Sequence, residues 1–153
     1  MIFKKESEFL YLLAFSLFIS SALYGLLLRW NFTFPLTFIN YQRFLQSHSH
    51  VAFLGWGYLA TIGVLISNFV EVSAKQNKVY KITIFSIVVT IFLMLISFPL
   101  VGYKTFSIVL LSVFGLASYV LSYRFLKDIK GNSVAHKLIK YGIYYYILSS
   151  LAT

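Results

Sequence analysis

Four long runs without a charged residue constrain this chain more than any other feature. The runs cover residues 9–28, 51–70, 82–103 and 105–123. Each is close to the roughly 20 residues that a helix needs to cross the hydrocarbon core of a bilayer. Because a helix satisfies its own backbone hydrogen bonds in lipid, these runs predict membrane-spanning α-helices.

A fifth apolar run starts near residue 138 and is still apolar at residue 153. It is too short to span comfortably, so we interpret it as a helix that is cut and the chain as a fragment of a longer membrane subunit. The alternative is a short tilted or re-entrant final helix. The sequence therefore predicts one all-α, polytopic transmembrane domain over residues 1–153, a bundle of about five helices over residues 9–28, 51–70, 82–103, 105–126 and 138–153.

Composition agrees with a membrane protein and restricts its chemistry. Of the residues, 59% are hydrophobic and only 11% are charged, which excludes an ordinary soluble domain. The absence of cysteine excludes disulfides, iron–sulfur clusters and thiolate-bound zinc, so a metal would have to be held by histidine, carboxylate or backbone groups. The sequence has no paired carboxylates, no serine–histidine–acid set and no phosphate loop, which argues against a hydrolase.

The basic residues behind the net charge of +9 cluster at the ends of the apolar runs. The charge therefore indicates membrane topology rather than nucleic-acid binding. Ten of the 13 Lys and Arg residues lie before the first run, between the second and third, or between the fourth and fifth. The other three are Arg29, Arg43 and Lys104. The positive-inside rule then places the amino terminus in the cytoplasm, and we expect a bacterial inner membrane. The alternative for residues 1–28, a cleaved signal peptide, is disfavoured because this apolar run is long for one.

The segment 29–47, between the first two runs, is rich in aromatic residues: Trp30, Phe32, Phe34, Phe38, Tyr41 and Phe44. Aromatic side chains concentrate at the headgroup level, so we interpret the segment as a membrane-anchoring belt, with a ligand-binding loop as the alternative. Residues 36–46 are expected to form an interfacial helix that lies on the membrane.

The metal-competent residues at the mouth of a membrane helix lie in the run 48–57, which begins His-Ser-His and ends Gly-Trp-Gly. A histidine at this depth is costly against lipid and normally faces the bundle interior, where it binds something. Imidazole is also a usual axial ligand of haem iron. The alternative is a pair of interfacial histidines that hydrogen-bond water and headgroups. The third histidine, His136, is expected to be solvated in an inner loop.

The run 48–57 resembles the second-helix motif of subunit I of the haem–copper oxidase superfamily, especially its C-type oxidase and nitric oxide reductase branches. In that family the opening histidine is an axial ligand of the low-spin haem, Asn or His follows two positions later, and an aromatic–glycine pair comes further on. These positions fall on His48, His50 and Trp56-Gly57. The family's second haem ligand and its copper-binding histidines lie in later helices, outside this stretch.

The two candidate metal ligands, His48 and His50, point about 200° apart on a regular helix, so both cannot bind one ion from there. The resemblance selects His48, whereas helical phase selects His50, which shares a stripe with Gly57, Thr61 and Asn68. We favour His48, because phase is unreliable in the first turn of a helix.

His50 would then hydrogen-bond a haem propionate alongside Arg43, whose guanidinium suits carboxylates. The predicted cofactor-binding set is therefore His48, His50, Arg43, Trp56 and Gly57.

Two functions follow as hypotheses. In the first, the chain is the amino-terminal part of a haem-binding subunit that in full passes electrons from a cytochrome or quinol donor toward oxygen or nitric oxide, and the fragment alone is inactive. Its other partners would be the bilayer and further helices of the same subunit or of a homo-oligomer. In the second hypothesis, the chain is a small, cofactor-free membrane protein of scaffold or assembly type.

The predicted sidedness can be tested by cysteine labelling, which is simple here because the chain has no cysteine. We expect a cysteine at position 4 (Lys4→Cys) to be protected from a membrane-impermeant maleimide in intact cells and to react after permeabilisation. A cysteine in the outer segment (Thr37→Cys) should react in intact cells. Labelling of position 4 from outside would contradict the topology.

Overall fold

The computed structural model describes residues 2–71 and 77–151, and every regular element in these ranges is a helix. In chain order the elements are α1 (Ile2–Thr33), α2 (Tyr41–His50), the π-helix η1 (Val51–Gly57), α3 (Tyr58–Phe69), α5 (Lys78–Val101), α6 (Thr105–Asp128) and α7 (Val134–Leu151). The predicted all-α fold is confirmed. Lys75, which entered the charge count, and the last two residues of the fifth apolar run lie outside the described residues.

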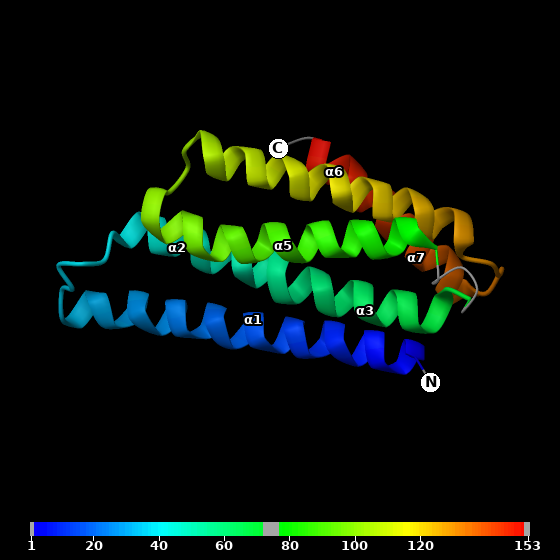
Figure 1. Ribbon diagram of the computed structural model, residues 1–153, viewed down its shortest axis with the longest axis horizontal. Coiled ribbons are helices and arrows are strands. Elements are labelled where there is room, and N and C mark those ends of the chain that lie inside the picture. Colours follow the sequence, from blue (N-terminus) through cyan, green and yellow to red (C-terminus); the bar gives the residue numbers. More distant parts are fainter. Residues whose placement is uncertain (1, 72–76, 152–153) are drawn as a thin grey trace.

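Four helical stretches are long and apolar enough to cross a membrane: Glu8–Thr33, Tyr41–Phe69, Lys78–Val101 and Thr105–Asp128. They run alternately up and down, so the beginning of α1, the end of α3, the beginning of α5 and the end of α6 share one end of the bundle (Figure 1). An ion pair of 3.6 Å between Lys130 and Glu71 also joins the α6–α7 connection to the end of α3. The chain is an integral membrane protein.

The second spanning stretch differs from its prediction. It starts at Tyr41 rather than at residue 51, because α2, η1 and α3 form one continuous helix. The side chain of Asn40 accepts a hydrogen bond from the backbone N–H of Arg43 and caps its start. At about 1.5 Å per residue these 29 residues extend about 43 Å, well beyond a hydrocarbon core of about 30 Å. The predicted interfacial helix over residues 36–46 is wrong as a separate element, because residues 36–40 are not helical and residues 41–46 begin this long helix.

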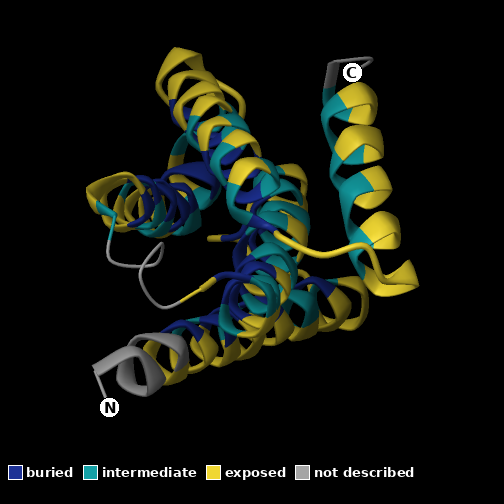
Figure 2. Cartoon of the chain, turned by 90° about the vertical axis from the view of Figure 1, so that its right-hand side faces the viewer, coloured by how far each residue is buried: buried dark blue, intermediate teal, exposed yellow. Residues whose placement is uncertain are grey.

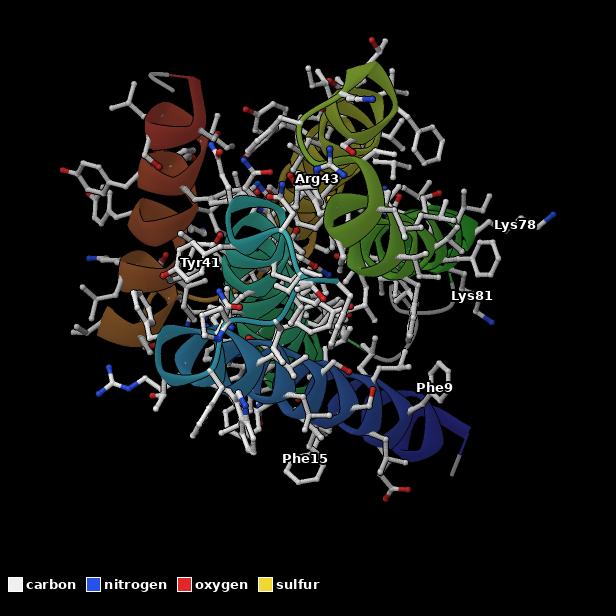
Figure 3. The ribbon with its side chains drawn as sticks, turned by 90° about the vertical axis from the view of Figure 1, so that its left-hand side faces the viewer. Phe9, Phe15, Tyr41, Arg43, Lys78 and Lys81 are labelled. Atoms are coloured by element: carbon white, nitrogen blue, oxygen red, sulfur yellow. The ribbon has the colours of Figure 1, made fainter. Side chains whose placement is uncertain are left out.

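The surface of the bundle is apolar and its interior contains small polar groups, as expected in lipid. Phe15 is 61% exposed and points away from the bundle (Figure 3). Ser47, Ser107 and Ser118, in contrast, are fully buried. At the start of α5, Lys78 and Lys81 also extend away from the other helices (Figure 3).

The buried apolar core has contributions from every spanning stretch. Its most enclosed members are Leu17, Val51, Leu59, Ile87, Ile91, Met94, Phe98, Leu121 and Phe125.

Helix α7 lies at the side of the bundle, with exposed residues along the face turned away from it (Figure 2). Hydroxyl contacts join it to α6: Tyr146 Oη donates to Ser118 Oγ at 2.8 Å, and the hydroxyls of Tyr119 and Ser150 lie 2.8 Å apart. In a bilayer such bonds contribute about 0.6 kcal/mol each. No described side chain of α7 is buried, so α7 is attached more weakly than the four longer stretches, each of which contributes to the core.

The junction of α1, α2 and α5 is organised by a proline. Pro99 lies inside α5 and has no N–H, so the carbonyl of Leu95, one turn earlier, loses its helical donor. The hydroxyl of Tyr24 in α1 donates to this carbonyl at 3.0 Å, and that of Ser47 in α2 approaches it at 3.5 Å. A carbonyl without a donor is costly in lipid, so this acceptor connects three helices.

The contribution of this junction can be measured with a double-mutant cycle. Tyr24→Phe should lower the free energy of unfolding by about 1 kcal/mol, because it removes the principal donor to Leu95. In a Pro99→Ala background the helix supplies its own N–H, so Tyr24→Phe should cost almost nothing there. SDS titration of the purified protein measures both values, with Tyr123→Phe on the exposed face of α6 as the control. An equal cost in both backgrounds would contradict the proposed role of the freed carbonyl.

Candidate functional site

The two candidate histidines lie at the end of α2, where the helix widens into η1. Seven residues from Val51 to Gly57 form this π-helix, and its exit is marked by the bond from the Tyr58 N–H to the carbonyl of Phe53, five residues back. π-helical turns are rare and frequently accompany functional sites. The site is therefore built from the last turn of α2 and the helices that pack on it, α1 and α5.

His48 faces α1. Its Nδ1 lies 2.8 Å from the backbone carbonyl oxygen of Ser21, and because a carbonyl can only accept, Nδ1 carries the proton. The hydroxyl of Ser21 in turn approaches the carbonyl of His48 at 3.3 Å. These contacts fix the tautomer and leave a lone pair on Nε2. Metal-bound histidines are commonly oriented in this way, with one nitrogen donating to a carbonyl.

Gly25 makes this arrangement possible. A Cβ atom at this position would lie 3.0 Å from His48 Cε1 and 3.4 Å from Nδ1. The ring therefore lies directly against the backbone of α1, one turn beyond Ser21. A glycine costs helix stability, and here the space that it leaves is filled by the imidazole.

His50 faces α5 and the turn that follows it. Its Nδ1 donates to the carbonyl of Gln46 at 2.7 Å, and its Nε2 lies 2.8 Å from the hydroxyl of Tyr103. The ring stacks on Phe98, with centroids 4.6 Å apart, and meets Tyr103 edge to face at 5.5 Å. Both nitrogens of His50 are thus engaged by this chain.

The structure therefore directs the two rings to different helices. Among the residues whose side chains the structure describes, 8–71 and 77–150, no group of three or more His, Asp or Glu could hold a metal ion. A metal held by this site would depend on a single histidine of the described chain together with ligands from elsewhere.

Arg43 belongs to α2, and its side chain reaches the end of α5 that precedes the turn to α6 (Figure 3). Its Nη1 donates to the carbonyl of Leu100 at 2.7 Å, which satisfies one of the unpaired carbonyls at the end of that helix. Next to it, Gly102 turns the chain with φ of 66°. The side-chain oxygen of Gln46 is buried beside this turn without a hydrogen-bond donor among the described residues.

Trp56 and Gly57 are the last two residues of η1, and neither forms a hydrogen bond or ring contact with His48 or His50. Trp56 meets Phe18 of α1 edge to face at 5.3 Å and is 38% exposed. An open, apolar groove of about 390 Å³ runs beside it, lined by Tyr11, Ala14, Phe15, Phe18 and Ala60. Gly57 is the last residue of η1, and its carbonyl accepts a hydrogen bond from the Thr61 hydroxyl at 2.8 Å.

His136 differs from its prediction, because α7 begins at Val134 and places it in the first helical turn rather than in a loop. Its Nδ1 lies 2.6 Å from Ser133 Oγ, and its ring edge meets Phe69 at 5.3 Å. It is at the opposite end of the bundle from the other two histidines.

Sequence reasoning missed three residues of the site: Ser21, Gly25 and Tyr103. The small pair Ser21 and Gly25 is one turn apart on a spanning helix, which is the usual signal of a close helix approach. No comparable signal marks Tyr103, since its position depends on the turn between α5 and α6.

Comparison with family models, with curated proteins and with solved structures gives no match for this chain. The class that the fold defines is that of polytopic α-helical membrane proteins.

Gly25→Ala tests the contact between His48 and α1. The added methyl group should displace the ring from Ser21 and lower the free energy of unfolding by about 1 to 3 kcal/mol. Gly115→Ala in α6 is the matched control, because a Cβ there would meet nothing within 4 Å and should be neutral or slightly stabilising. Thermal unfolding in detergent measures both. Equal effects of the two changes would show that the ring does not need the space at Gly25.

Proposed function

We propose that this chain is the amino-terminal part of a haem-binding membrane subunit that resembles haem–copper oxidase subunit I, and that His48 is an axial ligand of its haem. The observation that supports this most directly is the orientation of His48. Its Nδ1–H donates to the Ser21 carbonyl at 2.8 Å, so the remaining nitrogen, Nε2, has the lone pair that iron requires.

The residues around His48 fit one axial position of a haem. Ser21 orients the ring and Gly25 gives it room against α1, so His48 would offer Nε2 to iron in the tautomer that it already has. When bound, the haem would supply one-electron transfer, and the part of this chain would be to hold and orient it.

The second axial ligand would come from another helix of the full subunit or from a second copy of the chain. His50 is a poor candidate, because its Nε2 is already hydrogen-bonded to Tyr103. His136 lies at the other end of the bundle. A haem propionate near Arg43 would compete with the carbonyl of Leu100 for the same guanidinium.

In this proposal the full subunit receives electrons from a cytochrome or quinol and passes them toward oxygen or nitric oxide. Its membrane would be the bacterial cytoplasmic membrane, with the amino terminus inside. The concentration of basic residues in the inner connections supports this orientation.

The proposal is tested by the optical and electron paramagnetic resonance spectra of the membrane protein, purified as its complete reading frame. His48→Ala should abolish the low-spin haem signal, because it removes the iron ligand. His50→Ala should shift or weaken the signal, and His136→Ala, at the opposite end, should leave it unchanged.

Loss of the signal only in His50→Ala would transfer the ligand role to His50. A colourless wild-type preparation, or intact spectra in all three variants, would remove the haem proposal. The cofactor-free scaffold would then be the remaining function.

A further inference from the structure

The turn between α5 and α6 brings a tyrosine hydroxyl onto a histidine that belongs to another spanning helix. Tyr103 lies in this turn, directly after Gly102, and its hydroxyl is 2.8 Å from His50 Nε2. Residues 50 and 103 are far apart in sequence, so only the packing of α2 on α5 creates this pair. The proposed function uses this pair only to exclude His50 as the second haem ligand and assigns no role to Tyr103.

The direction of the hydrogen bonds can be assigned from their acceptors. His50 Nδ1 must donate to the Gln46 carbonyl, since a carbonyl has no proton to give. The neutral ring then has a lone pair on Nε2, and Tyr103 must be the donor to it. Partial burial raises the pKa of Tyr103 above its ordinary value, so the hydroxyl keeps its proton at neutral pH.

The surroundings hold the pair in place from several sides. Phe98 stacks on the His50 ring at 4.6 Å and meets the Tyr103 ring edge to face at 5.2 Å. Gly102, with φ of 66° and ψ of −150°, adopts a backbone conformation that residues with a Cβ rarely take, and this reverses the chain so that Tyr103 follows closely on α5. The hydroxyl therefore reaches Nε2 within a fixed cluster of three rings.

We infer that Tyr103 masks His50 and so determines which of the two histidines of the His-Ser-His sequence is available to a ligand. The only nitrogen of His50 that is free of the backbone is covered by the tyrosine hydroxyl. The corresponding nitrogen of His48 has no hydrogen-bond partner among the residues that the structure describes. The masking of His50 stands without the proposed function, whereas the selection of His48 as a haem ligand rests on it.

Masking has a chemical consequence for both rings. An electrophile, metal ion or haem iron can reach His50 Nε2 only after the bond to Tyr103 breaks, whereas no hydrogen bond among the described residues has to break at His48 Nε2. Tyr103 is 51% exposed, so its hydroxyl can be removed by mutation without emptying a buried position.

The experiment is modification of the full chain by diethyl pyrocarbonate, which acts on unprotonated imidazole nitrogen, followed by peptide mass spectrometry that resolves the histidines. In wild type we expect slow modification of His50. Tyr103→Phe keeps the ring and removes the hydroxyl, and should speed modification of His50 by about five- to tenfold, the factor that corresponds to one neutral hydrogen bond. His136 is the internal reference in every sample, and Tyr123→Phe is the matched control for loss of an exposed phenol.

A second variant separates the hydroxyl from the ring. Tyr103→Ala should speed modification of His50 at least as much as Tyr103→Phe does. If only the alanine variant reacts faster, the ring rather than the hydrogen bond covers His50, and the inference is wrong. It is equally wrong if wild-type His50 is modified as fast as a free histidine peptide. Because this readout needs no haem, its result is independent of the spectra that test the proposed function.

Discussion

The arrangement of this membrane protein depends on the need of every backbone carbonyl in lipid to find a donor. Pro99 removes one donor inside α5, and the resulting acceptor at Leu95 is met by hydroxyls from α1 and α2. The proline thus converts a local defect into a contact between three helices. Polar side chains of α2 find partners in the same region. Arg43 donates to a carbonyl of α5, and His50 accepts from a tyrosine in the turn that follows α5, so polar residues of α2 can pack against this helix.

The spanning helices were predictable because length and apolarity dominate the free energy of insertion. The start of the second helix was not, because residues 41–50 are polar and resemble an interfacial segment when hydropathy alone is considered. Their side chains are stabilised by partners on other helices, and a single sequence does not show which helices are neighbours. The position of His136 in α7 was missed for a simpler reason, since the helix starts a few residues earlier than its apolar run.

The location of the candidate site could be predicted from the sequence, but the contacts between its residues could not. The His-Ser-His sequence identifies the helix end, and its two rings do point to different helices, as the angular argument requires. The predicted stripe of His50 with Gly57, Thr61 and Asn68 was based on a regular α-helix. The π-helix η1 follows His50 directly and changes the angle between His50 and the later residues. Ser21, Gly25 and Tyr103 came only from tertiary contacts. The haem and its electron partners stay a proposal.

The π-helix also matters for how this chain should be aligned with others. A wide turn holds more residues than an α-turn over the same rise, so η1 behaves like an insertion within an otherwise continuous helix. A homologue that is wholly α-helical here would place its gap between residues 51 and 57. An ungapped alignment that fits the histidines would then misplace every position of α3 by part of a turn. Two proteins can therefore share a motif spacing across η1 although the side chains at the matched positions point in different directions.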